Sequence, residues 1–186
     1  MKVFVCIKQV PDTETKIKIL PDQSGIDSAG IKWVMNPYDE YAVEEAIKFK
    51  EKNSGAQVWV LTSGPKSRAG DALRTALAMG ADEAILINSP ENLDAYTTAK
   101  ALAETIKSEG GVHLIFAGKL AIDANQSSVP QMVAEFLGLP HTSVVSKFEA
   151  TAESTTVERD TDGGAKEIVQ MMNPSVVAAK IGRAHV

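Results

Sequence analysis

The stretch between residues 112 and 137 constrains the fold of this chain most strongly. An apolar run, VHLIFA at 112–117, breaks at Gly118 and gives way to a polar loop that extends to Ser128. Apolar residues then recur at helical offsets, and Pro130 suits a first helical turn. In a parallel α/β sheet, such a strand-loop-helix junction is where ligands bind, because free N–H groups at the helix start carry partial positive charge. We therefore expect this junction to favour an anionic ligand.

Length and charge narrow the function classes. The chain has 186 residues, enough for one domain with a sizeable core. Its formal net charge of -5 argues against nucleic acid or an anionic membrane as partner, since both favour clustered Lys and Arg. The single cysteine, Cys6, excludes an intrachain disulfide and favours a reducing compartment. No apolar run reaches the ~20 residues of a membrane helix, and no signal peptide is visible, so we expect a cytoplasmic protein without membrane insertion.

The first 140 residues alternate strands with helices, which predicts a parallel sheet with helices on its faces. We expect strands at 3–7, 57–61, 84–87 and 112–117, and helices at 37–52, 69–77, 95–106 and 129–137. Asn36 is expected to cap the first of these helices and Pro37 to occupy its first position. Between the first strand and this helix we expect a turn at 9–12, an edge hairpin arm at 16–20 and a loop at 21–30.

The pattern changes after Pro140. Strands are expected at 142–148, 155–159 and 166–171 without intervening helices, and Asp162-Gly163-Gly164 is a turn signal. We therefore divide the chain into an α/β unit at 1–140 and an antiparallel β appendage at 141–180, which either belongs to the same domain or extends its sheet. A further strand begins at 176–179, and we expect it to be cut short and to leave an unpaired edge.

Four loops follow strands on the expected carboxyl edge of the sheet, at residues 6–11, 36–39, 61–65 and 118–128. Several combine free helix-start amides with small polar side chains, so a nucleotide could be held with backbone donors on its phosphate. Structural loops are built in the same way, however, and Lys119 fits a solvated position as well as a phosphate contact. The residue pattern alone leaves both interpretations open.

Other reactive residue types fit ordinary structural roles. Cys6 ends a buried strand and is expected to be a small apolar filler, because no basic neighbour pattern activates its thiol. Glu44 and Glu45 are adjacent on a helix and do not face each other, so a solvated face is expected. Arg74 and Arg159 fit either pairing across subunits or plain surface charge. The histidines are isolated in sequence, which argues against a metal site.

Five sequence blocks, in this order, resemble the β subunits of electron transfer flavoproteins. They are KQVPD at 8–12, MNPYDEYAVEEA at 35–46, LRTALAMGAD at 73–82, GKLAID at 118–123 and VERDTDGG at 157–164. The resemblance extends from residue 1 to about residue 180. It implies an α/β fold with a doubly wound, Rossmann-like parallel sheet, similar to the adenine nucleotide α-hydrolases, together with the antiparallel appendage.

The resemblance also implies a function. In this family the β subunit forms a heterodimer with an α subunit that holds most of the FAD, and the β subunit binds AMP structurally or, in the electron-bifurcating form, a second FAD. The pair carries electrons from acyl-CoA and related dehydrogenases to electron transfer flavoprotein quinone oxidoreductase and the respiratory chain, as in fatty acid beta-oxidation. The β subunit is then an electron-carrier subunit without catalytic residues of its own.

By position, a set of residues in this sequence matches the residues that line the AMP site of the family. They are Cys6, Asn36, Pro37, Tyr38, Asp39, Ser63, Gly118, Lys119, Leu120, Ala121, Ile122, Asp123, Asn125, Gln126, Ser127 and Ser128. The Asn125-Gln126 pair resembles AMP-binding members, whereas bifurcating members tend to carry a Gly-Asp-Thr-Ala-Gln run that is missing here. The loop from Ala124 onward is shorter than the common family version. We therefore expect AMP.

Two other function classes require sequence motifs that differ from those of this chain. An ATP pyrophosphatase of similar fold would need a Ser-Gly-Gly-x-Asp-Ser turn after the first strand, where this chain has Gln9-Val10-Pro11. A nucleotide-sensing module of the universal-stress type would need a glycine-rich phosphate loop where residues 118–128 hold one glycine. The segment IGRAHV at 181–186 does not resemble the family and matches what a common sequencing-adapter stretch would encode, so we expect a non-native tail.

Overall fold

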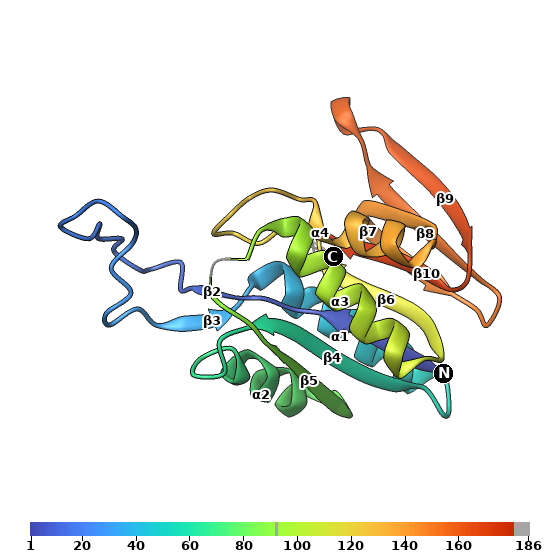
Figure 1. The fold of residues 1–186 in the computed structure, drawn as a ribbon. Coiled ribbons are helices and arrows are strands. Elements are labelled where there is room, and N and C mark those ends of the chain that lie inside the picture. Colours follow the sequence, from blue (N-terminus) through green and yellow to red (C-terminus); the bar gives the residue numbers. More distant parts are fainter. Residues whose placement is uncertain (92, 181–186) are drawn as a thin grey trace.

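The structure is a computed structural model that describes residues 1–91 and 93–180. In this part of the chain, one mixed sheet has the strand order β5-β4-β1-β6-β10-β7-β8-β9 (Figure 1). Its strands are β1 (Lys2–Cys6), β4 (Gln57–Gly64), β5 (Glu83–Asn88), β6 (Val112–Gly118), β7 (His141–Ala150), β8 (Ser154–Asp160), β9 (Lys166–Met172) and β10 (Ser175–Ala179). The helices are α1 (Pro37–Lys52), α2 (Gly70–Met79), α3 (Ala95–Glu109) and α4 (Val129–Leu137).

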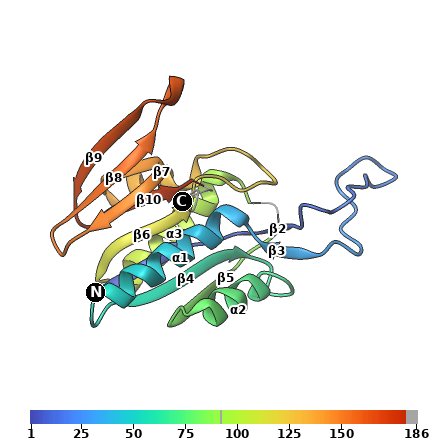
Figure 2. The same cartoon turned by 180° about the vertical axis from the view of Figure 1, so that it is seen from behind.

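Helices cover both faces of the parallel half of the sheet, as the two opposite views show (Figures 1 and 2). Along β1, Val3 and Val5 belong to the core cluster under α1 and α2, whereas Phe4 and Cys6 belong to the cluster under α3 and α4. This alternation buries both faces of the strand and requires a helical layer on each side. The predicted doubly wound α/β fold is confirmed. None of the helices in the described ranges is long and apolar enough to cross a membrane.

The predicted helix boundaries agree closely with the structure, because local signals set them. Pro37 occupies the first turn of α1, and Gly80 and Gly138 follow the last residues of α2 and α4 with positive φ values of 124° and 66°. Glycine adopts such angles without the steric cost that a Cβ atom brings. The expected support of α1 by Glu44 and Lys48 is also present, with an ion pair at 2.6 Å.

The last strand was predicted wrongly. Instead of being cut short at an open edge, β10 lies in the interior of the sheet, parallel to β6 on one side and to β7 on the other. All five of its residues are buried. A continuous apolar run without polar alternation is typical of a parallel strand covered on both faces, and VVAA at 176–179 is such a run. The antiparallel strands β7, β8 and β9 therefore continue the same sheet through β10.

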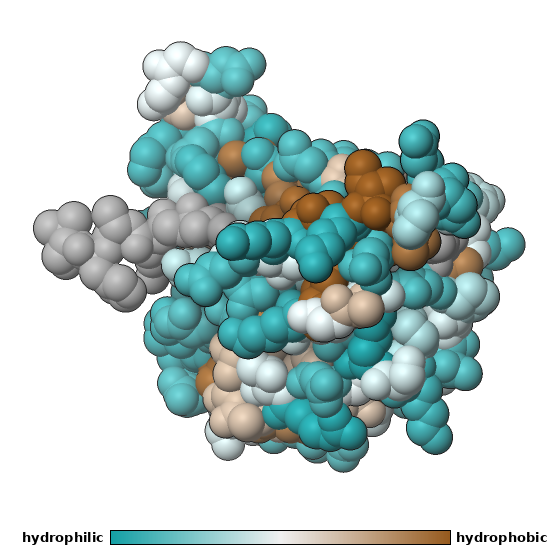
Figure 3. All heavy atoms as spheres, turned by 90° about the vertical axis from the view of Figure 1, so that its left-hand side faces the viewer, coloured by the Kyte–Doolittle hydropathy of each residue, from teal (hydrophilic) through white to brown (hydrophobic). Residues whose placement is uncertain are grey.

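A long arm lies between β1 and α1, and here too the structure corrects the predictions. The expected turn at 9–12 is β2 (Gln9–Pro11), which pairs antiparallel with β3 (Trp33–Met35). The expected hairpin arm at 16–20 forms only one isolated bridge, from Ile19 to Ile26. Its alternating Lys and Ile residues favour a strand, but no neighbouring strand among the described residues completes the pairing. The arm projects from the body (Figure 1), and Figure 3 shows the face from which it extends.

The non-native tail expected at 181–186 lies outside the described residues. The turn expected at 162–164 is confirmed as the short 3-10 helix η1 (Asp162–Gly164), in which Gly163 has a φ of 74°. The proposed division at residue 140 stays a prediction, although β7 is hydrogen-bonded to the strand that completes the parallel half of the sheet.

The interior position of β10 gives a test by core truncation. We expect Val177→Ala to lower the free energy of unfolding by about 2–3 kcal/mol, because Val177 is 1% exposed and its lost methyl groups leave a cavity. Ile168→Ala on the edge strand β9 is the control, since Ile168 is 75% exposed and should change stability by no more than about 0.5 kcal/mol. Urea unfolding followed by circular dichroism measures both. Equal effects would contradict an interior β10.

Candidate functional site

A cavity of about 280 Å³ opens where the parallel strands end. The loops after β1, β5 and β6 contribute to its walls, as do the end of β4 and the first residues of α3 and α4. β1 and β6 are neighbours in the sheet although β4 and β5 come between them in the chain, so their carboxyl ends form a topological switch point. Ligands of open α/β sheets bind at such points.

The structure brings most of the predicted site residues to this cavity. Those that line it are Cys6, Asp39, Ser63, Gly118, Lys119, Leu120, Ala121, Gln126, Ser127 and Ser128. Asn36, Pro37, Tyr38, Ile122, Asp123 and Asn125 do not line it but lie in the same segments, within two residues of a lining residue or in contact with one. The assignment of all these residues, lining or not, to a nucleotide site stays a prediction.

Asn36 is the N-cap residue of α1, as predicted, but its side chain supports the loop after β6. Its side-chain Nδ2 donates to the carbonyl oxygen of Leu120 at 2.8 Å, and its Oδ1 accepts from the backbone N–H of Ile122 at 3.2 Å. The side chain makes no capping bond to α1. Because Asn36 is fully buried, its amide groups need partners, and this loop provides them. The cavity wall at 120–122 is thereby tied to the start of α1.

Asp39 joins the ends of two strands. One carboxylate oxygen accepts from the backbone N–H of Lys8 at 2.7 Å, and the other accepts from the backbone N–H of Gly118 at 3.0 Å. This bridge needs a glycine at position 118, because a Cβ atom there would lie 2.6 Å from Cβ of Tyr38 and 2.8 Å from its backbone carbonyl carbon. The first turn of α1 therefore packs directly against the end of β6.

Two buried groups in the cavity wall have strongly shifted pKa values. Burial raises the pKa of Asp39 to about 7, although hydrogen bonds from the N–H groups of Lys8 and Gly118 act in the opposite direction. Burial also raises the pKa of Cys6 to about 12, and the nearby Asp39 carboxylate adds to this effect. The Cys6 thiol therefore stays protonated at neutral pH, which agrees with the predicted filler role.

The start of α4 offers the cavity an anion-binding surface. Ser128 at the N-cap makes no side-chain capping bond, and Pro130 has no N–H, so the N–H groups of Val129 and Gln131 are the ones without such a partner. The start of α3 differs, because the Asp94 carboxylate accepts from the N–H of Thr97 at 2.6 Å. Just before α4, Asn125 and Ser127 have φ values of 54° and 50°, a strained backbone of the kind that clusters at ligand clamps.

One wall of the cavity was missed by the sequence analysis. It consists of Ser89, Pro90, Glu91, Leu93, Asp94, Ala95, Thr98 and Leu102, from the loop after β5 and the first half of α3. The hydroxyl groups of Ser63 and Ser89 lie 2.8 Å apart, which links this wall to the end of β4. Their position in the sequence could have indicated this wall, because these residues follow a parallel strand just as the predicted loops do.

Lys8 also lines the cavity without having been predicted. Its ammonium group pairs with the carboxylate of Asp123 at 2.6 Å, so the loops after β1 and β6 meet through side chains as well as through Asp39. Arg74 and Arg159 pair within the chain with Asp71 and Glu167, respectively. Among the described residues, no cluster of His, Cys, Asp and Glu is arranged to hold a metal ion.

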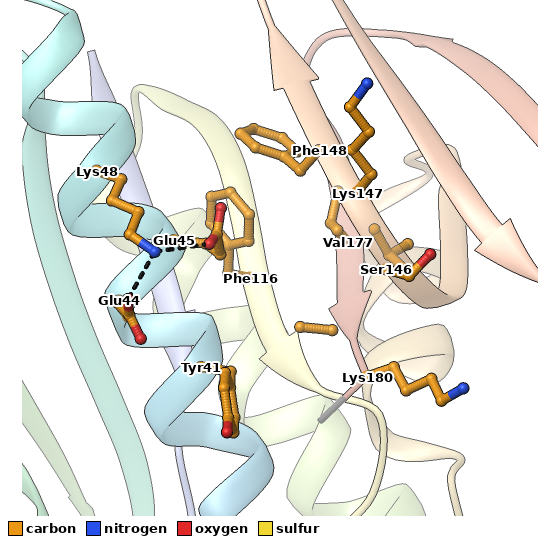
Figure 4. Close-up of a pocket in the computed structure, with 12 residues that line it drawn as sticks. Tyr41, Glu44, Glu45, Lys48, Phe116, Ser146, Lys147, Phe148, Val177 and Lys180 are labelled. Carbon is orange, nitrogen blue, oxygen red and sulfur yellow. Dashed lines mark hydrogen bonds and ion pairs between the residues drawn. The ribbon is translucent and has the colours of Figure 1, made fainter. Parts of the chain in front are cut away.

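A second, smaller hollow lies between α1 and the strands β6, β7 and β10 (Figure 4). Lys48 pairs there with Glu44 at 2.6 Å and with Glu45 at 3.2 Å. The two carboxylates therefore share a lysine as their counter-ion and do not form a carboxylate pair. The volume of about 40 Å³ leaves room for about one water molecule. This hollow is too small for a nucleotide.

Comparison with known proteins identifies the family of this chain. Residues 24–183 match the family model described as "Electron transfer flavoprotein domain". This chain belongs to the electron transfer flavoprotein family. Electron transfer flavoprotein β subunits are electron carriers and not enzymes.

Curated β subunits of the family are similar over almost the whole chain. The electron transfer flavoprotein subunit beta of Syntrophomonas wolfei is 42% identical over 181 residues, covering 97% of this chain and 70% of that protein. The Bacillus subtilis subunit is 38% identical, covering 98% and 70%, and the human subunit is 37% identical, covering 97% and 71%. The rice relatives carry the description mitochondrial. The chain is therefore a homologue of electron transfer flavoprotein β subunits.

The contact between α1 and β6 can be tested by filling it. We expect Gly118→Ala to lower the free energy of unfolding by roughly 1–3 kcal/mol, because the added methyl group would displace Tyr38 and Asp39. The control is Gly25→Ala, since nothing lies within 4 Å of a Cβ atom at Gly25. Urea unfolding measures both, and a neutral Gly118→Ala would contradict the close approach.

The raised pKa of the single cysteine predicts poor reactivity. We expect the native chain to react with iodoacetamide at about pH 8 more than about a hundredfold slower than the urea-unfolded chain, because Cys6 is buried and its thiolate is disfavoured. Mass spectrometry over a time course measures both rates. The unfolded sample controls for reagent activity, and similar rates would show that Cys6 is accessible and ionised.

Proposed function

We propose that this chain is the β subunit of an electron transfer flavoprotein and that it binds AMP as a structural group in the cavity at the carboxyl ends of the strands. The observation that supports this most directly is the uncapped start of α4 in the wall of that cavity. Free N–H groups at a helix start favour a phosphate, and a mononucleotide brings a phosphate together with an apolar base.

The composition of the cavity wall fits a mononucleotide. Backbone groups from the loop after β6 and the helix start would hold the phosphate, while hydroxyl groups such as those of Ser63 and Ser89 could serve the ribose. Leu102 and Ala117 supply apolar surface for a base. Ligand cavities typically measure about 300–1,000 Å³, and a cavity of about 280 Å³ lies at the small end, which fits a mononucleotide.

The bound AMP would stabilise the native chain rather than react. A ligand that binds only the folded state shifts the unfolding equilibrium by mass action, and AMP would tie together loops that are distant in the sequence. The redox chemistry would come from FAD held mostly by the α subunit. Within the described part of this chain, Cys6 and Asp39 are the strongly shifted groups at the cavity, and neither is needed as an acid or base for electron transfer.

The proposed partners follow from the family. The α subunit would form the heterodimer, acyl-CoA and related dehydrogenases would donate electrons, and electron transfer flavoprotein quinone oxidoreductase would accept them on the way to the respiratory chain. A role in fatty acid oxidation and a location in the cytoplasm belong to the same proposal. The homology of the chain to curated β subunits supports it.

Nucleotide analysis of the heterodimer tests the proposal. We expect this chain, co-expressed and purified with its α subunit, to release one AMP and one FAD per pair on denaturation, as measured by mass spectrometry. Two FAD per pair would contradict AMP and indicate the bifurcating form. ATP turnover without bound flavin would contradict the carrier function altogether.

A cavity-blocking variant locates the AMP in the same preparation. Ala124 lines the cavity and is exposed, so Ala124→Trp adds bulk at the site without disturbing the core. We expect the AMP content to fall at least about tenfold, a loss of about 1.4 kcal/mol of binding free energy. The control is Ala152→Trp at an exposed turn outside the cavity wall. Unchanged AMP in Ala124→Trp would place the nucleotide elsewhere.

A further inference from the structure

A buried carboxyl group stands in the cavity wall without an ion-pair partner among the described residues. Asp39 is 5% exposed, and its two oxygens accept the uncharged backbone N–H groups of Lys8 and Gly118, while a hydrogen bond from the Asn36 side chain also lowers its pKa. The charge of Lys8 acts in the same direction, but its ammonium group pairs with Asp123 at 2.6 Å rather than with Asp39. Burying a carboxylate without a paired cation is costly, so the structure needs a reason to keep an acid here.

The position of Asp39 determines the spacing of the cavity walls. Its hydrogen bonds join the ends of β1 and β6, which are the two strands at the switch point. The segments that follow both strands line the cavity, through Lys8 on one side and Lys119 to Ala121 on the other. A change in the protonation of Asp39 therefore acts on two walls at once, because a protonated carboxyl group is a weaker acceptor than a carboxylate.

An anion in this cavity would act on Asp39 in turn. Asp39 itself lines the cavity, so a bound phosphate and the carboxylate would share a partly desolvated space. A nearby like charge disfavours the ionised form of a carboxyl group. Burial already raises the pKa of Asp39 to about 7, so this carboxyl group titrates in the neutral range. A modest further rise of its pKa would then increase the fraction of Asp39 that is protonated.

We propose that Asp39 is a positioning residue of the nucleotide site, holding the ends of β1 and β6 together and taking up a proton when a nucleotide phosphate enters the cavity. This inference rests on the proposed binding of AMP. In the proton step, one proton moves from solvent to the Asp39 carboxylate and no covalent bond of the nucleotide changes. By linkage, the affinity for AMP then decreases as the pH rises through the neutral range, since the complex holds more protons than the free chain.

Other titratable groups around the cavity do not account for the same effect. The pKa of Cys6 is raised to about 12, so its thiol is neutral throughout the neutral range. Charged groups face the cavity from each surrounding segment: Lys8 after β1, Lys119 after β6, and Glu91 and Asp94 between β5 and α3. Asp123 does not line the cavity but pairs with Lys8. The pKa of Asp94 is lowered by its bond to the N–H of Thr97, which keeps that carboxylate ionised.

The direct test is proton uptake by the full chain. AMP binding to the nucleotide-free protein is measured by titration calorimetry at about pH 7 in two buffers of different ionisation enthalpy. We expect uptake of up to about half a proton, because a group with a pKa of about 7 is already half protonated before the ligand arrives. Adenosine is the matched ligand without phosphate, and we expect it to bind without this uptake. Equal uptake with both ligands, or none with AMP, would overturn the inference.

A variant assigns the proton to Asp39. We expect the Kd for AMP of the native chain to rise severalfold between about pH 6.5 and pH 8, and this rise to disappear in Asp39→Asn, which cannot ionise. The phosphate of AMP titrates near pH 6, but it does so equally with both proteins. Asp162→Asn, at an exposed turn outside the cavity wall, should keep the native profile.

The possible results separate the two proposals. AMP binding with the same pH profile in the native chain and in Asp39→Asn overturns the role of Asp39 and leaves the proposed function intact. A native chain that binds no AMP overturns the proposed function. If Asp39→Asn does not fold, the calorimetric comparison of AMP with adenosine, which needs no variant, still shows whether phosphate binding takes up a proton, and no uptake overturns the inference.

Discussion

The structure depends on the burial of β1 on both faces. Val3 and Val5 pack toward α1 and α2, while Phe4 and Cys6 pack toward α3 and α4, and the first three of these side chains are fully buried. Such a strand is stable only between two helical layers. It also lies in the middle of the parallel strands, with β4 on one side and β6 on the other. The carboxyl ends of β1 and β6 meet there, and this meeting point creates the cavity.

Close backbone contacts then convert this meeting point into a defined site. The helix start of α1 approaches β6 so closely that only glycine fits at position 118. Asp39 and Asn36, both in or next to the first turn of α1, direct their polar groups to the ends of β1 and β6 rather than to α1 itself. The start of α1 thus organises the cavity wall, while the start of α4 is left without a capping side chain for a ligand.

The sequence predicted the features that depend on local chemistry and missed those that depend on long-range pairing. Pro37 and Gly80 correctly mark helix ends, and the loop after the strand at 112–117 does reach the cavity. The interior position of β10 was not predicted, because strand order is set by contacts between residues far apart in the chain. Asn36 stands at the N-cap of α1 as expected, but its side chain makes no capping bond, because its amide pairs instead with Leu120 and Ile122. The burial of Asp39 was not predicted, because an acidic residue in the first turn of a helix is equally compatible with an exposed position.

The placement of β10 has a consequence for synthesis on the ribosome. β6 and β7 are made before β10, yet neither borders the other, and each hydrogen-bonds to β10 instead. Until residues 175–179 have been made, neither β6 nor β7 has the strand that it pairs with on this side. The pairing of β10 with both strands joins the two halves of the sheet by contacts between residues far apart in the chain, and such contacts form slowly.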